Sequence, residues 1–411
     1  MGPRPARQRE RHLGRQRRCN PAGRAAGRDS HLRPRALAQR TPPRRCGPAC
    51  PWLRAARGSP SPHQRRTRPT VPPPRHHHRR RRMGKTICCH RPHRRLKCSS
   101  AISEVCVVRV TLVHQGALGD TLLLMPLVRS IKARFAAEGG VHVTLVTRPN
   151  LGQALTMHGH IDAFASADDR AHSAWFAPPE GDKPNSRPDW ATCDVLLSAV
   201  SNGDDAWAAN ARLAVNPGTM ICYFEPRPPA DYPGHVTTFH RVMLGSLSLP
   251  GAPPVPVCSN PDGPILVHPG SGGEAKCWPR ENFIQLARDL KRNGIILTII
   301  LGEAEQERWG RALMKELGDE FPFYLHIGLY ELIEKMSRAR IYLGNDSGVS
   351  HLAAMTGVPT ITLFGPSDDR QWRPVGPHVE VLRAPPPHER DLTRLSVPDV
   401  MAAIMAELRR I

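Results

Sequence analysis

The feature that most constrains the fold is a pattern that occurs twice: an apolar run, a glycine turn, and then helical spacing of apolar residues. The first copy starts with the run Val-Cys-Val-Val-Arg-Val-Thr-Leu-Val at 105–113 and turns at 116–120. The second starts at 265–268 and turns through Pro-Gly-Ser-Gly-Gly at 269–273. Such a run is typical of a buried parallel strand, and strand, turn, helix and strand together form a βαβ unit. The chain is therefore predicted to be α/β, with two halves.

The remaining pattern supports two doubly wound halves joined by a linker. In the first half, helical spacing covers 121–135 and 235–249, and strand-like runs cover 141–147, 194–200 and 220–224. In the second half, helices are predicted at 280–293, 327–338, 350–355 and 397–409, and strands at 295–301, 341–344 and 360–364. Residues 250–264 are rich in proline and glycine, which predicts the linker. We therefore expect domains at 101–255 and 256–411, with a cleft between them that binds ligands at the carboxyl ends of the strands.

The positive charge of the chain is concentrated in its first hundred residues. The whole chain has 58 Lys or Arg and 36 Asp or Glu, a formal net charge of +22. Residues 1–100 hold 29 of those basic residues against Glu10 and Asp29, a net charge of +27, so the rest of the chain is mildly acidic. This Arg- and Pro-rich segment lacks the apolar residues that a core requires, and we expect it to be disordered. Any polyanion binding by it would be unspecific electrostatics, and we expect no specific nucleic-acid partner.

Met83 follows directly after the run of arginines, which gives residues 1–100 a second interpretation. Translation could start at or beyond Met83, with the upstream text outside the native protein. We expect no transmembrane segment, because no run of about 18 apolar residues occurs, and no secretory signal, because the N-terminus lacks an apolar centre. The cysteines lack the spacing of zinc ligands, which favours reduced thiols and a cytoplasmic protein.

The glycine loop at 269–273 has features that suit a phosphate group. A loop of this kind after a strand offers backbone N–H groups to phosphate oxygens. Ser271 can add a hydroxyl donor, and Lys276 can place a point charge beside a diphosphate. An ordinary glycine-rich turn with a solvated lysine explains the loop equally well when it is considered alone.

A second motif, Gly-Asn-Asp-Ser-Gly at 344–348, also follows a predicted strand. Asp346 or Ser347 can cap the next helix, whose first N–H groups would then face the cleft. His351 lies about one turn into that helix, within reach of a phosphate. A capping box with a surface histidine is the equally weighted alternative.

Two carboxylates complete the candidate site. Glu305 follows a buried strand, where it could accept hydrogen bonds from ribose hydroxyls, although a solvated helix start is the better explanation when this motif is considered alone. Asp120 is predicted at a helix N-terminus beside the cleft, where it could take a proton from an attacking hydroxyl group. Its position alone favours a simple helix cap. No arrangement of acidic residues requires a metal ion.

Taken in order, these motifs resemble glycosyltransferase family 9, the bacterial heptosyltransferases of lipopolysaccharide core assembly. The region that matches runs from about residue 105 to 395. Its motifs are Gly-Ala-Leu-Gly-Asp at 116–120, His-Pro-Gly-Ser at 268–271, Lys-Cys-Trp-Pro at 276–279, Gly302 to Glu305, Gly-Asn-Asp-Ser-Gly at 344–348 with His351, and Leu-Phe-Gly-Pro at 363–366. Each motif alone is weak evidence for the family, whereas the whole set in this order and spacing is specific for it. The family often has an arginine just before the first glycine turn, where this chain has His114 and Gln115, and residues 151–193 match poorly.

The resemblance implies a GT-B architecture, meaning two Rossmann-like domains that face each other across a cleft. It also implies an inverting transferase that uses an ADP-sugar, typically ADP-heptose, without a metal or other cofactor. Asp120 would be the general base, and Lys276 would neutralise the diphosphate. The implied donor-binding residues are Ser271, Gly272, Glu305, Asp346, Ser347, Gly348 and His351.

The implied acceptor is a lipid-linked glycan at the membrane surface, so we expect a cytoplasmic enzyme, at most peripheral on the inner face of the membrane. Two alternatives stay open within this fold: a nucleotide-sugar binder without activity, and a transferase of a different sugar. A nucleic-acid-binding protein, suggested by the basic segment, is the alternative from another class.

Overall fold

The computed structural model describes residues 107–302 and 310–411. The segment 1–100 that is predicted to be disordered, the alternative start near Met83, and Glu305 lie outside these residues. The described residues form two parallel sheets, one on each side of the predicted linker at 250–264. Within them, no helix is both long enough and apolar enough to cross a membrane.

The first half is built on a five-stranded sheet in the order β3-β2-β1-β4-β5, with every neighbouring pair parallel. Its strands are β1 (Val108–Val113), β2 (Val141–Thr147), β3 (Ala163–Ser166), β4 (Val195–Ser198) and β5 (Met220–Tyr223). The central strand β1 pairs with β2 on one side and β4 on the other, with Val110 opposite Val143 and Val195. The chain reverses its direction of winding between β1 and β4, so this point is the switch point of a doubly wound sheet.

The second half repeats this topology with one more strand, in the order β11-β10-β9-β6-β7-β8. Its strands are β6 (Ile265–His268), β7 (Leu297–Leu301), β8 (Phe323–Leu325), β9 (Ile341–Asn345), β10 (Thr360–Leu363) and β11 (Val379–Leu382). The switch point lies between β6 and β9, which are the strands that precede the two predicted phosphate-binding motifs. The prediction of two Rossmann-like halves is confirmed.

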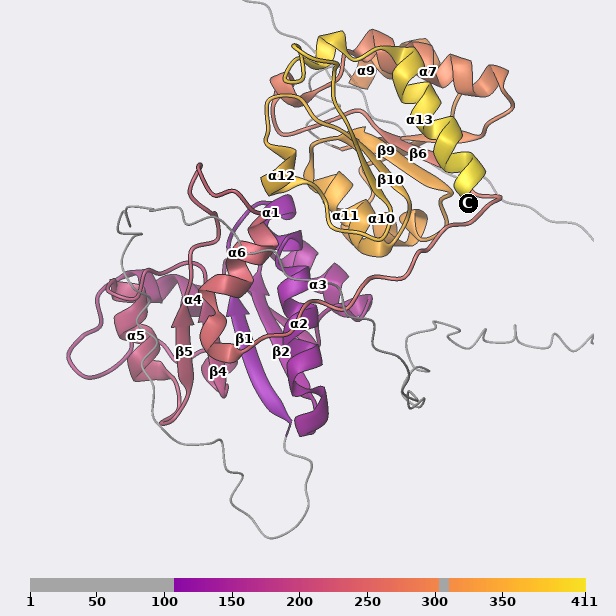
Figure 1. Cartoon of the computed structure of the whole chain (residues 1–411). Coiled ribbons are helices and arrows are strands. Elements are labelled where there is room, and N and C mark those ends of the chain that lie inside the picture. The colour runs from indigo at the N-terminus through magenta and orange to yellow at the C-terminus, as the bar shows by residue number, and fades with distance from the viewer. Residues whose placement is uncertain (1–106, 303–309) are drawn as a thin grey trace, which may run out of the picture. The chain divides into compact units, whose positions relative to one another are not determined.

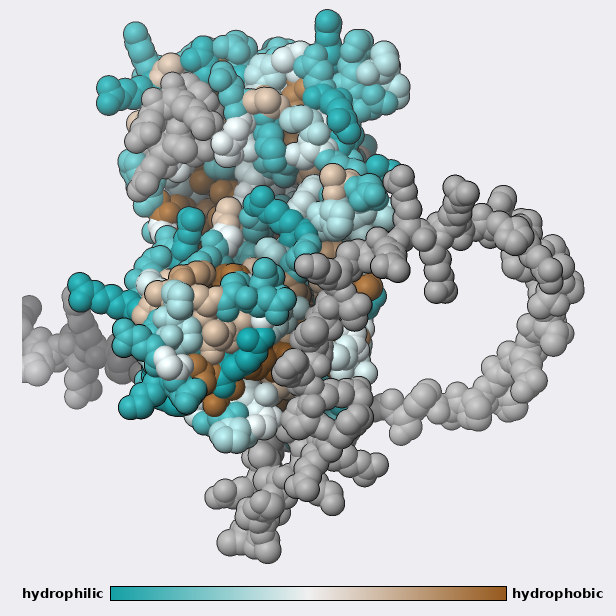
Figure 2. All heavy atoms as spheres, turned by 90° about the vertical axis from the view of Figure 1, so that its left-hand side faces the viewer, coloured by the Kyte–Doolittle hydropathy of each residue, from teal (hydrophilic) through white to brown (hydrophobic). Residues whose placement is uncertain are grey.

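Helices flank the strands of each half (Figure 1). Those of the first half are α1 (Leu118–Leu122), α2 (Met125–Phe135), α3 (Pro149–Met157), α4 (Arg170–Ser173), α5 (Ala206–Ala214) and α6 (Val236–Met243). Those of the second half are α7 (Arg280–Arg292), α9 (Arg311–Leu317), α10 (Leu329–Met336), α11 (Gly348–Thr356), α12 (Asp369–Trp372) and α13 (Val397–Arg410). Apolar side chains from strands and helices fill the cores, and Figure 2 shows mainly polar side chains, with small apolar groups between them, on the face that it draws.

The predicted single helix at 121–135 is wrong, because the chain forms two helices with a break between them. Pro126 lies in the first turn of α2 and has no backbone N–H, so it cannot continue the hydrogen bonds of α1. The Leu124 N–H donates to the carbonyl of Thr121 at 3.0 Å, which tightens the end of α1. The short helix α1 therefore holds the glycine turn and Asp120 separately from the longer α2.

The poorly matching segment at 151–193 contains most of α3, all of β3 and two of three packed tryptophans that the pattern did not predict. The rings of Trp190 and Trp207 lie 5.7 and 6.4 Å from the ring of the buried His172, and both pack against Trp175, at 4.8 and 5.0 Å between centroids. The indole N–H of Trp207 donates to His172 Nε2 at 3.2 Å, and His172 Nδ1 contacts the carbonyl of Ala167 at 3.0 Å. The three indole rings belong to one buried cluster with Leu196 of β4 and Ile221 of β5.

Candidate functional site

The glycine loop after β6 is fastened to the turn after β9 by side chains from both segments. The Asn345 side chain is fully buried; its Nδ2 donates to the carbonyl of Pro269 at 2.7 Å, and its Oδ1 accepts from the Trp278 N–H at 3.0 Å. The Ser271 hydroxyl donates to the carbonyl of Asp346 at 2.6 Å. One asparagine thus fixes both ends of the loop, because its amide offers a donor and an acceptor. Sequence reasoning quoted Asn345 only as part of the motif and assigned it no role.

Lys276 lies in a short 3₁₀ turn at the end of this loop and forms an ion pair with Asp346. The Lys276 Nζ lies 2.7 Å from Asp346 Oδ2, and the Asp346 side chain is only 8% exposed, whereas that of Lys276 is 41% exposed. The buried carboxylate therefore anchors an ammonium group that still reaches the solvent. The sequence placed both residues near a diphosphate, and the structure adds that they contact each other.

The N-terminus of α11 is ordered by its own hydroxyl groups. Ser347 is the N-cap, and its hydroxyl accepts from the N–H of Ser350. The Ser350 hydroxyl donates to the carbonyl of Asn345 at 2.5 Å. These bonds turn the chain sharply from β9 into α11 and direct the first N–H groups of the helix away from the strand.

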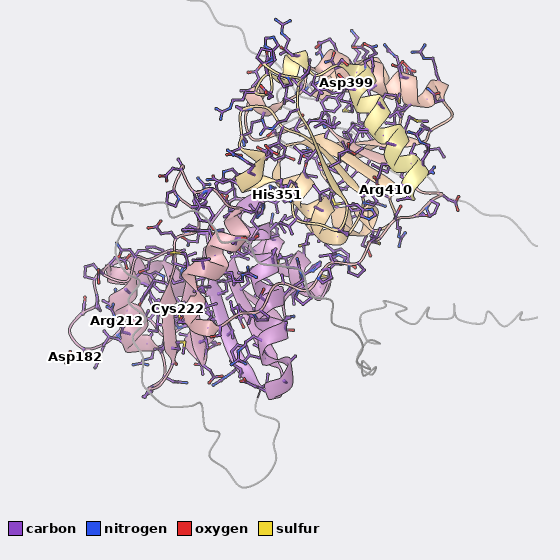
Figure 3. All side chains as sticks on the ribbon, in the orientation of Figure 1. Asp182, Arg212, Cys222, His351, Asp399 and Arg410 are labelled. Carbon is purple, nitrogen blue, oxygen red and sulfur yellow. The ribbon has the colours of Figure 1, made fainter. Side chains whose placement is uncertain are left out.

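Helices α1 and α11 pack against each other through glycines, which brings the two halves into contact. A Cβ added to Gly348 would lie 2.9 Å from Leu118 Cβ, and one added to Gly119 would lie 3.2 Å from the ring of His351. His351 is buried in α11 (Figure 3) at this contact. Small residues are needed on both sides for the helices to approach this closely.

The turn that carries Asp120 is built around the buried His114. A Cβ on Gly116 would lie 2.3 Å from the His114 ring, so only glycine fits there. The Gly116 N–H donates to His114 Nδ1 at 3.2 Å, which requires that nitrogen to be unprotonated. Burial accordingly lowers the pKa of His114 to about 4, and burial likewise lowers the pKa of His351 to about 4.

These two imidazoles should make the stability of the protein depend on pH. An unfolded histidine has a pKa near 6.5, so between about pH 4 and 6.5 the unfolded chain binds more protons than the folded one. The contribution of these histidines to the free energy of unfolding should have its full value above about pH 6.5. This contribution should decrease as the pH falls toward 4. Between pH 7.5 and 5.0 the loss should be about 2 kcal/mol for His114, and His351 should change the stability in the same direction.

Urea unfolding of His114→Asn at pH 7.5 and 5.0 checks this expectation. The variant should show a smaller fall in unfolding free energy than the wild type over this range. His142→Asn, at an exposed position on β2, is the control and should retain the wild-type pH dependence. An unchanged dependence in His114→Asn would contradict a neutral, buried imidazole in the folded state.

Asp120 forms an ion pair with Arg227, a residue that sequence reasoning missed. The Arg227 Nη2 lies 2.6 Å from Asp120 Oδ2, and the Asp120 side chain is 18% exposed. Arg227 lies in the segment after β5, and its neighbour Pro226 accepts a hydrogen bond of 2.8 Å from His240 Nε2. Its position could have indicated a role in the site, because Arg227 is a basic residue that follows shortly after β5, the last strand of the first half. The carboxyl ends of parallel strands lie at the same edge of a sheet, where ligands bind.

The structure brings these groups together around one cavity of about 550 Å³. Eight of the nine predicted site residues line it, and these are Asp120, Ser271, Gly272, Lys276, Asp346, Ser347, Gly348 and His351. Arg227, Asp368 and Trp372 are among the further lining residues. The ninth, Glu305, lies outside the described residues. The roles assigned to these side chains stay predictions, while their common location is a property of the fold.

A smaller, mainly apolar cavity of about 310 Å³ adjoins the first one. The two share Ala117, Gly119, Ser271, Gly272, Ser347 and Gly348. The smaller one is completed by Ile300, Leu301, Gly302, Ile327, Leu329, Leu332 and Val349 among others. A polar compartment and an apolar compartment thus meet at the glycine loop. In residues 107–302 and 310–411, no three His, Cys, Asp or Glu side chains are grouped as metal ligands.

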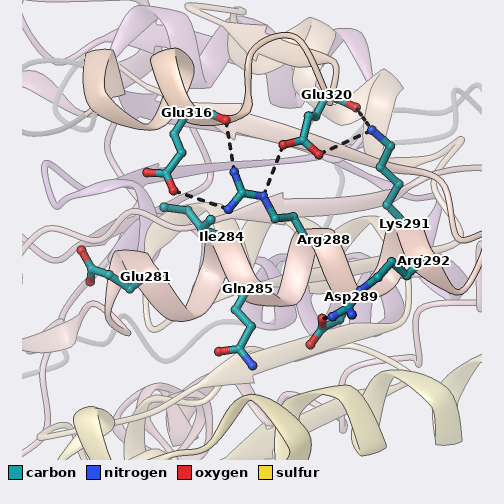
Figure 4. Close-up of a pocket in the computed structure, with 9 residues that line it drawn as sticks. All are labelled: Glu281, Ile284, Gln285, Arg288, Asp289, Lys291, Arg292, Glu316 and Glu320. Atoms are coloured by element: carbon teal, nitrogen blue, oxygen red, sulfur yellow. Dashed lines mark hydrogen bonds and ion pairs between the residues drawn. The ribbon is translucent and has the colours of Figure 1, made fainter.

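A separate hollow of about 790 Å³ lies along α7, and no residue of the glycine loop lines it (Figure 4). Its charged side chains are largely paired with each other: Arg288 contacts Glu316 at 3.6 Å and Glu320 at 3.3 Å, and Lys291 contacts Glu320 at 3.5 Å. Neighbouring Arg292 and Asp289 also form an ion pair. Because the charges on this open surface neutralise each other, it is a weaker candidate site than the cavity with Asp120 and Lys276.

Part of the chain matches a known protein family. Residues 252–400 match the model of glycosyltransferase family 9 (heptosyltransferase), and this range contains Lys276 and Asp346. This match spans 149 of the 411 residues of the chain, all of them in the linker and the second half.

One curated relative extends the likeness beyond the residues that match the family model. Lipopolysaccharide heptosyltransferase 2 of Salmonella typhimurium is 26% identical over 316 residues, which covers 67% of this chain and 88% of that protein. Lipooligosaccharide heptosyltransferase 2 of Haemophilus influenzae is 28% identical over 116 residues, and the match spans 27% of this chain and only 33% of that protein.

Solved structures show the same GT-B architecture. E. coli heptosyltransferase WaaC with ADP aligns with a TM-score of 0.54 at 19% identity, covering 73% of this chain and 100% of that one. A family 9 glycosyl transferase from Veillonella parvula aligns with a TM-score of 0.57 at 18% identity, covering 74% of this chain and 98% of that one. The predicted GT-B fold is therefore confirmed.

Proposed function

We propose that this chain is a family 9 glycosyltransferase that moves a heptosyl group from ADP-heptose to a hydroxyl group of a lipid-linked glycan, with inversion at the anomeric carbon and without a metal ion. The observation that carries the proposal is the single cavity lined by Asp120 from the first half and Lys276 from the second. A base for the acceptor and a cation for the leaving diphosphate are the two groups that this reaction requires.

In the proposed complex, the donor spans both compartments. The diphosphate would lie in the polar cavity, against the N–H groups around Gly272 and the N-terminus of α11, with Lys276 beside it. The adenosine would occupy the apolar cavity, with Glu305 near the ribose. WaaC of the same fold has been solved with ADP and with ADP-2-deoxy-2-fluoro heptose, which supports the choice of nucleotide.

The contacts refine the role proposed for Asp346. A carboxylate would repel a diphosphate, and the Asp346 carboxylate is already paired with Lys276. We therefore assign Asp346 to holding Lys276 in place. Ser271 in turn donates its hydroxyl proton to the main chain of the same residue, which keeps the glycine loop against this pair.

The proposed step needs only these groups. The acceptor oxygen attacks the anomeric carbon of the sugar while the bond from that carbon to the diphosphate oxygen breaks. Asp120 takes the proton of the attacking hydroxyl group, and ADP leaves with an additional negative charge. Lys276 and the N-terminus of α11 stabilise this charge more in the transition state than in the bound donor, which accelerates the reaction.

The acceptor is proposed from the relatives, which are named for lipopolysaccharide and lipooligosaccharide. A lipid-linked acceptor of that kind would place the enzyme at the cytoplasmic face of the membrane. In this proposal the acceptor approaches the cavity beside Asp120 and Arg227, the lining residues that come from the first half. The acceptor sugar itself is a matter for experiment.

Thermal unfolding with a panel of nucleotides tests the donor. We expect ADP and ADP-heptose to raise the melting temperature of the full chain and UDP and GDP to have little effect, because a ligand that binds only the folded state stabilises it. ADP should then be released from ADP-heptose when lipopolysaccharide core acceptors are added, and EDTA should leave the rate unchanged. Stabilisation without ADP release would favour the inactive nucleotide-sugar binder. Stabilisation by UDP or GDP alone would refute the proposed donor.

A further inference from the structure

The segment that carries Arg227 has an unusual support. Residues 224–235, which we call the β5–α6 loop, connect β5 to α6 and contain four prolines, at positions 226, 228, 229 and 233. Each proline lacks a backbone N–H, so the loop has few donors with which to satisfy its own carbonyl groups. Its conformation therefore depends on donors from other parts of the protein.

The main external donor is Gln371, in α12 of the second half. Its side chain is only 5% exposed. Its Nε2 lies 2.8 Å from the carbonyl oxygen of Tyr232, 3.2 Å from that of Pro229 and 3.5 Å from that of Ala230. One buried amide thus contacts three carbonyl oxygens of the loop's main chain, all within residues 229–232. Buried amides of this kind make a large difference to local order, because their partners lose their hydrogen bonds together when the amide is removed.

Two neighbours of Gln371 connect it to the cavity. Trp372 lines the cavity, and so does Asp368, which is the N-cap of α12. On the other side, His235 Nε2 at the end of the loop contacts the carbonyl of Arg373 at 2.9 Å. The segment 368–373 therefore touches both the cavity and the β5–α6 loop.

We propose that Gln371 is a positioning residue for the transfer reaction: it holds the β5–α6 loop so that Arg227 meets Asp120. This inference rests on the proposed function, since it assigns Asp120 as the base. It makes the second half responsible for the geometry of a group in the first half. The base would be correctly held only when the two halves are in contact, which couples donor binding to readiness for proton transfer.

Two substitutions separate this role from general stability. Gln371→Ala removes the amide, and Gln371→Glu keeps its shape while replacing the donor with an oxygen that repels the three carbonyls. Gln285→Ala, at an exposed position on α7, is the matched control. Backbone hydrogen exchange of the ligand-free full chain should increase by about tenfold within residues 225–235 in both Gln371 variants, and should be unchanged in β1 and β6.

Kinetics then test the consequence for the reaction. With ADP-heptose as the donor and water as the acceptor, both Gln371 variants should lower the kcat of ADP release by about tenfold, with the donor KM and the Kd of ADP within about twofold of the wild type. Unchanged exchange in the loop, or a loosened loop with an unchanged kcat, would overturn the proposal. Failure of the wild type to bind ADP would instead refute the proposed function, and the ligand-free exchange comparison would still decide whether Gln371 holds the loop.

Discussion

Replacing Asp120 with asparagine should lower the rate of sugar transfer by about 10²- to 10⁴-fold, the usual contribution of a general base. Asparagine keeps the size of the side chain and removes its ability to accept a proton. Asp120 lies in the short helix α1, across the cavity from Lys276 and the glycine loop, so the donor site should form normally. The Kd of ADP should therefore change by no more than about twofold. The substitution removes an interaction that forms only in the transition state, and such a loss leaves the affinity for the bound nucleotide unchanged.

The measurement is ADP release and product formation under single-turnover conditions, with calorimetry for ADP binding. Asp182→Asn is the control, because Asp182 is an exposed aspartate of the same half (Figure 3) that does not line the cavity. Full transfer activity in Asp120→Asn would remove Asp120 from the reaction. A large loss of ADP affinity would show instead that the residue organises the donor site. Arg227→Ala should have a smaller effect than Asp120→Asn, since Arg227 contacts the base from a largely exposed position.

Most of the fold could be predicted because its strands are buried on both faces. The run at 141–147 is rich in β-branched residues and the run at 265–268 is mostly apolar, and the structure places strands with the same bounds there. The break between α1 and α2 could not be read from apolar spacing, because Leu and Ile continue through it and only Pro126 signals the interruption. The segment at 151–193 was also missed, because its order comes from packing of Trp175 and Trp190 against distant residues.

The candidate site was predictable for the residues that lie in glycine-rich motifs. Gly116, for example, is required by its close contact with the neighbouring His114, and the glycines of such a motif are recognisable in a sequence. Partnerships across long separations were not predictable. Arg227 meets Asp120 across 107 residues of chain, and Gln371 meets Tyr232 across 139. The local sequence can at most place a residue such as Arg227 at the edge of its sheet, whereas the topology of the two sheets determines which partner it meets.

Replacing Lys276 with alanine should lower the kcat of transfer by about 10²- to 10³-fold, the usual loss when one group that stabilises a developing negative charge is removed. In the proposed reaction Lys276 supplies the side-chain positive charge beside the leaving diphosphate, and its ammonium group is held by the buried Asp346 at 2.7 Å. Asp346→Asn should have a smaller effect, about tenfold, because the charge of Lys276 persists while its anchor is weakened. The pair should also be strongly non-additive, as expected for residues that act as a unit.

The double variant tests this dependence directly. If Asp346 acts through Lys276, then Asp346→Asn should cause little further loss of kcat in a Lys276→Ala background. Lys315→Ala, at an exposed position on α9, is the control for removal of a lysine and should retain full activity. If the two losses multiplied, Asp346 would have a role of its own at the nucleotide, as the family resemblance implies. If Lys276→Ala transferred sugar at the wild-type rate, the charge on ADP would have to be stabilised by the backbone N–H groups of the glycine loop and α11 alone.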